Sequence, residues 1–393
     1  MDDQTISSAL QHVQAIVEKI GPRPAGSEAE RKAIDYVRDR LISWGYAPQV
    51  QEVSFAPLPL FYPLNVLVGV LLVVSAFALE ELPRLTIWLP FIFMLIPRVS
   101  KYLIRSRPTI AKSQNLIAYT SQDESVPLLV LCAHVDTART IVLRNRMLRK
   151  LYFRAMTIIQ RTAFVVAFMS FVIVFGFTFP PGFIWVVRAI AVLVGGAYIL
   201  ADLLNQFAHR NIYSPGAYDN ASGVGVVLEL AEYFSNLPPN RLRLGFLFTG
   251  AEETGLHGAD VFARYLVEKG IEAAVLNFDM VGAGRYLYYV EREGSIFPQS
   301  TSRELNQLLR TANPDIKPFW YTLRSGDFSP FLRYKIPATS LQTGGSESVE
   351  LVYHNVDDTL AVIEEHVLEA VVETVKKFVE LVQYSDWAIA DKR

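Results

Sequence analysis

Five side chains able to bind a metal ion each end, or closely follow, a different apolar segment. They are His134, Asp219, Glu253, Asp279 and His354. Imidazole nitrogens and carboxylate oxygens suit zinc in an open catalytic site. In α/β sheets, ligands gather beyond the carboxyl ends of the strands. Taken alone, His134 is better explained as a core histidine with satisfied hydrogen bonds, and Asp219 can equally be a helix N-cap. The ordered set therefore predicts the metal site, and no single member does.

Two further acids lie beside these candidates. Glu252 directly precedes Glu253 after the apolar segment 241–250. Adjacent acids are costly if buried unpaired, and either a metal ion or an exposed loop removes that cost. Asp136 is two residues from His134 on an apolar segment, so both side chains point to the same side. A carboxylate that holds the far nitrogen of a ligating histidine fixes its tautomer, and we expect this role for Asp136.

Other chemistries are poorly supported. Ser222 in NASGVG lacks the GxSxG pattern of a nucleophile elbow, and segment 221–225 lacks the lysine of a phosphate loop. Cys132 is the only cysteine, which excludes intramolecular disulfides, and its apolar surroundings predict a buried thiol. The formal net charge is -2 and no basic strip with aromatics is present, so we expect no nucleic-acid partner.

The order of predicted elements favours an α/β fold. Amphipathic helices at 5–20 and 27–44 flank GPRPAG, with Ser27 and Glu30 as a capping box. Strands are predicted at 46–55, 115–120, 127–135, 241–250, 273–282 and 337–343. Helices are predicted at 222–236, 257–269, 302–312 and 360–382. Alternating strands and helices predict a three-layer αβα sandwich around a mixed, mostly parallel sheet.

Two apolar stretches interrupt this pattern. Residues 56–79 carry no charge and 85–97 follow them, while 162–187 and 190–201 form a second pair. A spanning helix needs about 20 apolar residues. An even number of crossings returns the chain to its sheet, so we predict two inserted transmembrane helical hairpins. Re-entrant segments, buried core helices or a hydrophobic dimer surface are the alternatives.

The predicted domain boundaries follow from these stretches. Residues 1–55, 111–138 and 213–393 are predicted to form one α/β domain that carries the five candidate ligands. Residues 56–110 form the first hairpin insertion. Residues 139–212 form a basic juxtamembrane segment and the second hairpin, which leaves the domain after His134 and returns before Asp219. We therefore expect the metal site near the bilayer surface.

Charge predicts the orientation of about four spans. RVSKYLIRSR carries four basic residues and no acid, and segment 139–161 carries seven basic residues and no acid. Both lie on the side of the catalytic domain, so the positive-inside rule predicts an integral membrane protein with a cytoplasmic catalytic domain. The run RNRMLRKLYFR is suited to anionic lipid headgroups, which makes the lipid bilayer an expected partner. The N-terminal MDDQTISSALQHVQ has no signal-peptide pattern.

The series HVDT, YDNASGVG, GAEETGLHGA, NFDMVG and YHNVDDT resembles the co-catalytic di-zinc aminopeptidase family. That family includes bacterial leucyl aminopeptidases and, more distantly, the glutamate carboxypeptidase and glutaminyl cyclase folds. GPRPAGSEAERKA is similar to its opening helices. The resemblance covers about residues 1–55, 111–138 and 213–385. The two hydrophobic insertions are absent from the soluble members.

The resemblance implies two zinc ions per chain, bridged by Asp219. His134 and Asp279 would complete one site, and Glu253 and His354 the other. It implies supporting and catalytic roles for further residues: Glu252 as general base, Asp136 and Asp358 as partners behind the ligands, and Tyr353 or Tyr321 as oxyanion donor. Arg324 and Asp327 are candidates to position substrate. Tyr218 and Phe328 depart from the family pattern, which puts substrate preference in doubt but not catalysis.

The predicted activity is a metallo-aminopeptidase acting on peptides, with Glu252 activating a metal-bound water. A carboxypeptidase or dipeptidase is the alternative, because the ligand set does not separate them. A glutaminyl cyclase operates with one zinc and fits a set of five ligands less well. An inactive scaffold or receptor would be expected to lose ligands or the base. The side-chain preference and the oligomeric state stay open.

Overall fold

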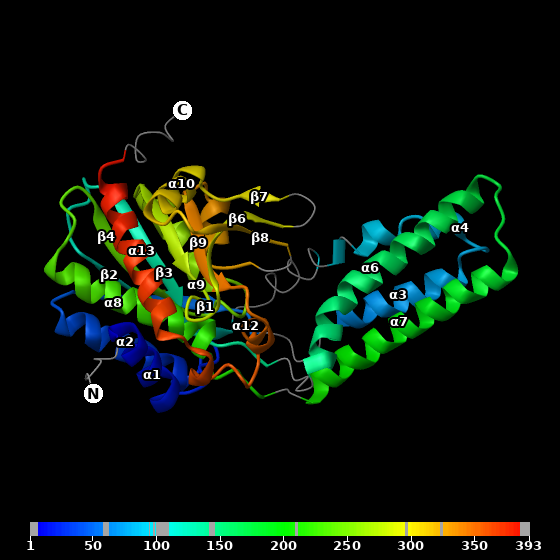
Figure 1. The fold of residues 1–393 in the computed structure, drawn as a ribbon, viewed down its shortest axis with the longest axis horizontal. Coiled ribbons are helices and arrows are strands. Elements are labelled where there is room, and N and C mark those ends of the chain that lie inside the picture. The colour runs from blue at the N-terminus through cyan, green and yellow to red at the C-terminus, as the bar shows by residue number, and fades with distance from the viewer. Residues whose placement is uncertain are drawn as a thin grey trace. The chain divides into compact units, whose positions relative to one another are not determined.

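The computed structural model describes residues 7–57, 63–93, 95–96, 99, 110–140, 146–208, 211–294, 298–322 and 325–385. The chain forms two units. One comprises Met1–Pro57, Thr109–Thr140 and Tyr213–Arg393, and the other Leu58–Pro108 and Ile141–Ile212. The first unit is an α/β structure and the second is helical (Figure 1). The division into a peptidase domain and two membrane insertions stays a prediction.

A nine-stranded mixed sheet organises the first unit. The strands are β1 (Gln49–Phe55), β2 (Ala111–Tyr119), β3 (Leu128–His134), β4 (Arg243–Thr249), β5 (Ala273–Phe278), β6 (Tyr286–Glu293), β7 (Gln299–Ser300), β8 (Lys317–Tyr321) and β9 (Ala338–Gly344). Their order is β1-β2-β4-β3-β5-β9-β6-β7, with β8 pairing β6. The central strands β4, β3, β5 and β9 are parallel, whereas β1, β2 and β6 join antiparallel. The sheet is therefore mixed, as expected, but parallel pairing is limited to its central strands and to the pair β6–β8.

Helices cover both faces of this sheet, because alternate strand residues point to opposite sides. Leu129 and Leu131 pack in one apolar cluster, while Val130 and Cys132 pack in the other. The first cluster includes residues of α1 (Ser8–Lys19), α2 (Glu28–Ser43), α8 (Ser222–Asn236), α10 (Arg303–Ala312) and α13 (Glu365–Gln383). The second includes residues of α9 (His257–Lys269) and α11 (Phe328–Arg333). Cys132 is buried, as predicted.

The predicted capping box is only half formed. Ser27 Oγ accepts a hydrogen bond from the Glu30 amide at 3.1 Å, which begins α2. The Glu30 carboxylate instead accepts from the amides of Gly26 and Ala251 and from the Ser113 hydroxyl. These partners draw the side chain into the core, because a buried carboxylate must find donors there.

The helical unit contains α3 (Pro63–Phe77), α4 (Pro83–Thr86), α6 (Arg146–Val174) and α7 (Pro181–Ala208). Residues of α3, α6 and α7 share an apolar core with Leu89 and Phe93. By length and composition, the segment Pro181–Leu203 could cross a membrane, whereas the apolar helices Val66–Phe77 and Ile158–Val174 are shorter. At 1.5 Å per residue, α3 extends about 22 Å, less than the ~30 Å of a hydrocarbon core. Among the described helices, therefore, one is long and apolar enough to be a candidate membrane span, whereas four spans were expected.

Candidate metal centre

Asp219 lies between two histidines. Its Oδ1 is 3.3 Å from His134 Nε2, and its Oδ2 is 3.3 Å from His354 Nε2. Each histidine also faces a second carboxylate: Asp279 Oδ1 is 3.8 Å from His134 Nε2, and Glu253 Oε2 is 3.3 Å from His354 Nε2. The five predicted ligands therefore converge as two groups that share Asp219.

These groups have the chemistry of a cation site. Ligand atoms of His134, Asp219 and Glu253 lie within 4.8 Å of one another. Glu253 Oε1 and Asp279 Oδ1 are buried and accept no hydrogen bond from the described residues. A buried carboxylate oxygen without a donor is costly unless a cation satisfies it. The residues present therefore fit bound zinc.

Electrostatics point the same way. Burial alone would lower the pKa of His354, but Glu253 and Asp219 outweigh it and raise this pKa to about 10. For His134, burial is again outweighed, by Glu252, Asp219 and Asp279, and its pKa lies well above the usual value. Nearby carboxylates thus make the electrostatic potential at both imidazoles negative, and a bound divalent cation would offset this negative charge.

The sheet brings the ligands together. His134 is the last residue of β3 and is paired with Thr249, the last residue of β4. Asp279 directly follows β5, the other neighbour of β3. The three carboxyl ends therefore meet at one edge, as expected for parallel neighbours.

The loops that carry the remaining ligands contain strained backbone. Positive φ occurs at Ala251 (56°), Met280 (57°) and His354 (49°), each at or within two residues of a proposed ligand. Non-glycine residues adopt this region only where their surroundings enforce it. Asp219 lies in the irregular turn Ala217–Ala221 before α8. It is not the helix cap, because Asn220 Oδ1 accepts the Gly223 amide at 3.1 Å.

Asp136 supports the metal centre differently from the expectation. His134 Nδ1 lies 3.1 Å from the main-chain carbonyl oxygen of Asp136, and the carboxylate is farther away at 3.7 Å. That carboxylate accepts the amides of Glu252 at 3.0 Å and Glu253 at 3.1 Å. Asp136 therefore holds the loop of the two glutamates more directly than it holds the imidazole ring.

Glu252 is a buried acid beside the ligands. Burial raises its pKa well above the usual value, and Glu253, Asp327 and Asp279 raise it further against the opposing effect of His134. A carboxylate so placed has a high affinity for a proton, which is a property of a general base in catalysis.

Of the remaining predicted residues, one borders the centre, two are buried away from substrate, and one is not described by the structure. Tyr353 stacks on the His354 ring with centroids 3.8 Å apart, so it borders the centre. Tyr321 is buried in the second apolar cluster against Phe328, which makes it a poor oxyanion donor. Asp327 is buried and accepts a hydrogen bond from Thr249 Oγ1, so it supports the strand end and does not present a surface to substrate. Arg324 lies outside the described residues.

Two buried charges near the centre were missed. Glu30 accepts the Ala251 amide at 3.2 Å, one residue before Glu252. Arg23 Nε donates to the Val135 carbonyl at 2.9 Å, one residue after His134. The only sequence signal was the position of both residues within GPRPAGSEAE, where a charge in a turn ordinarily faces water.

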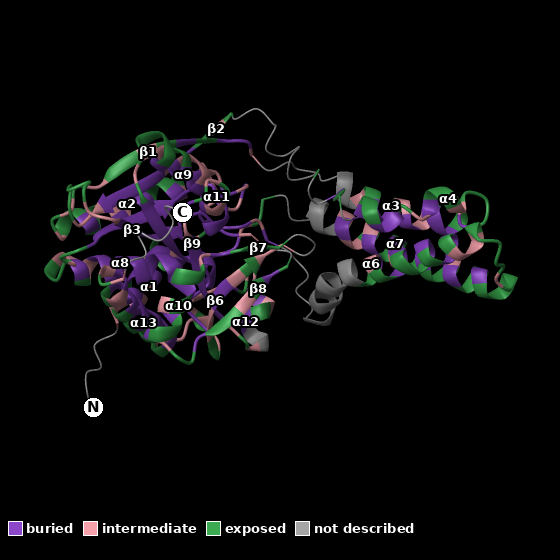
Figure 2. Cartoon of the chain, turned by 90° about the horizontal axis from the view of Figure 1, so that it is seen from above, coloured by how far each residue is buried: buried purple, intermediate pink, exposed green. Residues whose placement is uncertain are grey.

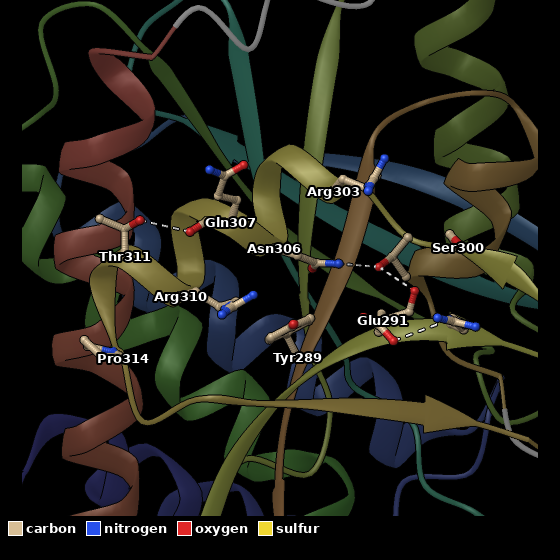
Figure 3. A pocket seen from close by; sticks show the side chains of 11 residues that line it. Tyr289, Glu291, Ser300, Arg303, Asn306, Gln307, Arg310, Thr311 and Pro314 are labelled. Carbon is tan, nitrogen blue, oxygen red and sulfur yellow. Dashed lines mark hydrogen bonds and ion pairs between the residues drawn. The ribbon is translucent and has the colours of Figure 1, made fainter.

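A groove of about 840 Å³ lies elsewhere on this unit, lined by α10, β6 and β7. Figure 3 shows Arg303, Gln307 and Arg310 of α10 near Tyr289 and Glu291 of β6. The Ser302 amide, just before α10, donates to the carbonyl of Ala338 at the first residue of β9. That is the amino end of β9, opposite to the edge where the ligands meet. The groove lining contains no histidine and one acid, so it is not the metal centre.

Comparison with known proteins agrees with this geometry. Residues 199–379 match the model of peptidase family M28. Aminopeptidase YwaD of Bacillus subtilis is 31% identical over 196 residues, which are 45% of this chain and 42% of that protein. The chain therefore spans less than half the length of this relative.

Solved structures share the fold. A leucine aminopeptidase precursor from Bacteroides thetaiotaomicron superposes with a TM-score of 0.57 at 16% identity, covering 95% of this chain and 99% of that one. A glutaminyl cyclase from Porphyromonas gingivalis gives 0.57 at 18% identity, covering 96% and 99%. At these identities the likeness establishes the architecture and leaves the activity open.

Proposed function

Because residues 199–379 are related to the zinc peptidases of family M28, we propose that this chain is a zinc metallo-aminopeptidase that removes N-terminal residues from peptides. One observation carries the proposal. The two carboxylate oxygens of Asp219 face two different histidines, each with a second acid beside it. A bridging carboxylate between two cations has this arrangement.

In this proposal, His134, Asp219 and Asp279 would hold one zinc ion and Asp219, Glu253 and His354 the other. When bound there, zinc would supply Lewis-acid chemistry: it would lower the pKa of a water and polarise a carbonyl. Glu252 accepts the proton of the attacking water and returns it to the leaving amine. Asp136 keeps Glu252 in place through its main-chain amide. Tyr353, next to His354, is the proposed donor to the developing oxyanion.

The charges around the site favour an aminopeptidase over a carboxypeptidase. Seven acids surround it: Asp136, Asp219, Glu252, Glu253, Asp279, Asp327 and Asp358. Two divalent ions would leave this set negative, which suits a substrate ammonium group better than a carboxylate. Arg23, a buried arginine of this region, has its side-chain donors bound to main-chain carbonyls. It is therefore not available as the carboxylate partner that a carboxypeptidase needs.

A panel of fluorogenic peptides tests this choice. Substrates with a free N-terminus should be cleaved, and their N-acetylated forms should be resistant because the ammonium group is lost. Preferential cleavage of blocked peptides with a free C-terminus would support the carboxypeptidase instead. No cleavage of either class by zinc-loaded protein would support an inactive scaffold.

We also propose that the helical unit is embedded in a lipid bilayer. Three phenylalanines at helical spacing on α6 are more than half exposed, Phe164, Phe168 and Phe171, and so is Phe175 directly after the helix. Figure 2 shows exposed residues along α3, α6 and α7. An apolar surface of this extent is unfavourable in water and is typical of contact with lipid or a partner.

The position of Arg188 on α7 is compatible with this environment. Its guanidinium is 2.9 Å from Glu80 Oε2 and lies 5.3 Å from the centre of the Trp185 ring. A paired arginine beside tryptophan is typical of the end of a span. With the basic segments on the catalytic side, the proposed orientation places the catalytic unit in the cytoplasm. The number of spans is open between the one long helix and the four expected.

A further inference from the structure

The second insertion separates two proposed ligands. The chain leaves the α/β unit after Thr140 and returns at Tyr213, with His134 shortly before and Asp219 shortly after. Bringing the two ends of this long segment together costs conformational entropy. The segment itself does not hold its ends at a fixed distance. Contacts at the base of the insertion must therefore set the distance between these ligands.

Arg23 makes such contacts with both ends. Its Nε donates to Val135 O at 2.9 Å on the outgoing segment. On the returning segment, one terminal nitrogen donates to Pro215 O at 3.1 Å and the other to Gly216 O at 3.0 Å. A further bond to Gly21 O at 2.7 Å anchors the guanidinium to its own turn. One side chain thus joins the strand end of His134 to the turn of Asp219.

The main chain around Arg23 reinforces the connection. The Arg23 amide donates to Thr137 Oγ1 at 2.8 Å, and the Thr137 amide donates to the Arg23 carbonyl at 3.0 Å. Gly216 has φ +66°, and a Cβ there would overlap Thr137 and lie 2.7 Å from Asp219 O. The close approach of the two segments therefore requires glycine at this position.

The choice of arginine has a physical reason. Four carbonyl oxygens converge on one buried point, and only a guanidinium offers enough donors in a fixed plane. Burial lowers the pKa of Arg23 to about 10, while Asp358, Asp136 and Asp219 act against this shift. The group therefore stays charged at neutral pH although its direct partners are neutral carbonyls. A fully buried charge of this kind is costly, which indicates a specific positional role.

We propose that Arg23 is a positioning residue. It joins the two segments at which the second insertion leaves and re-enters the α/β unit, and it thereby sets the spacing between His134 and Asp219. Zinc affinity, and not only folding stability, then depends on it. This inference rests on the proposed zinc centre.

The test compares Arg23→Gln and Arg23→Lys with Arg243→Met in the full-length protein. Arg243 is a matched control, because it is also buried but begins β4, at the end of the strand away from the ligands. Zinc affinity is measured by competition with a chromophoric chelator, and folding by thermal melting. Peptide turnover is measured at increasing free zinc.

Substitutions behind metal ligands typically weaken metal affinity by about 10–100-fold. Arg23→Gln should fall in this range, and excess zinc should partly restore its turnover. Arg23→Lys, which keeps the charge but loses the planar fork, should show a smaller loss. Arg243→Met should lower the melting temperature with zinc affinity unchanged.

Wild-type zinc affinity in Arg23→Lys, or in folded Arg23→Gln, would overturn the proposal. If Arg23→Gln does not fold, Arg23→Lys decides. Equal losses of zinc affinity in Arg243→Met would make the effect one of general destabilisation. Failure of the wild-type protein to bind zinc is a separate result, which would reject the proposed function itself.

Discussion

Asp358 holds Asp219 by its main chain: Asp358 Oδ2 accepts the Asp219 amide at 3.0 Å, and Oδ1 accepts the preceding Tyr218 amide at 2.6 Å. The side chain of Asp219 is thereby free to face both histidines. Asp136 treats Glu252 and Glu253 in the same way. The loops of Asp219 and Glu253 are thus each held by one buried carboxylate that receives two consecutive amides.

Asp358→Asn should therefore weaken zinc binding. The amide side chain offers one acceptor oxygen and presents N–H groups to main-chain donors. We expect zinc affinity to fall by about 10–100-fold, as for other partners behind metal ligands. Chelator competition measures the change. Asp315→Asn, in an exposed loop, is the control and should bind zinc normally. Unchanged affinity in Asp358→Asn would show that the turn of Asp219 is held by other contacts.

The adjacent glutamates should behave differently. Glu252→Gln should retain zinc but lose turnover by about 10²–10⁴-fold, because the amide cannot accept the proton. Glu253→Gln should lose one of the two zinc ions, because Glu253 Oε2 faces His354 and its other oxygen has no donor among the described residues. Elemental analysis and turnover of both variants separate these roles. Turnover like that of the wild type in Glu252→Gln would remove this residue as the base.

Tyr353 and Tyr321 can be separated in the same manner. If Tyr353 donates to the oxyanion, Tyr353→Phe should reduce kcat by about 10²-fold with little change in KM. Tyr321→Phe should leave kcat unchanged, because its ring packs against Phe319 and Phe328. Steady-state kinetics at saturating zinc give both values. An unaltered kcat in Tyr353→Phe would limit this residue to packing on His354.

His12 should make the α/β unit sensitive to acid. Burial, with a smaller effect of Arg40, lowers the pKa of His12 from 6.5 to about 4. Below pH 6.5 the unfolded chain gains a proton that the folded chain does not, so the free energy of unfolding falls until about pH 4. At pH 5 the loss should be about 2 kcal/mol.

Urea unfolding at pH 7.5 and pH 5 measures this loss. His12→Gln removes the titrating group, so its stability should fall less between the two pH values than that of the wild type. Zinc dissociation in acid affects both proteins and cancels in the comparison. Equal losses in the two proteins would show that His12 titrates normally in the fold.

The orientation of the helical unit can be measured with one introduced cysteine. Cys132 is buried, whereas Gly182 is exposed, and a Cβ at Gly182 would have nothing within 4 Å. In intact cells, Gly182→Cys should react with a membrane-impermeant maleimide. Gln122→Cys, on an exposed loop of the catalytic unit, should react only after lysis. The reverse pattern would place the catalytic unit outside, and labelling of both would contradict a bilayer between them.

The proximity of His134, Glu253 and Asp279 was predictable, because these residues end or follow apolar strands that are parallel neighbours. His134 and Asp279 stand out as polar residues at the ends of such strands, and parallel packing then brings them together. Arg23 and Glu30 were not predictable, since their roles depend on carbonyls and amides far away in the chain. Strands β6, β7 and β8 were missed, because they lie on one side of the sheet and few of their residues are buried.

In the apolar segments, amino-acid composition predicted helices but not where each helix ends. Residues 85–97 are apolar enough to suggest one continuous helix, but α4 ends at Thr86, a turn follows at Ile87 and Trp88, and the chain is helical again at 89–93. Apolar content alone does not fix helix length, which depends on packing against neighbouring helices.

The zinc content of the purified, detergent-solubilised protein tests the central claim most directly. Because Asp219 joins two ligand groups, elemental analysis should find two zinc ions per chain. Asp219→Asn should lose both, since each group shares this residue. Fewer than one zinc ion per chain in carefully prepared wild-type protein would contradict the two-zinc centre.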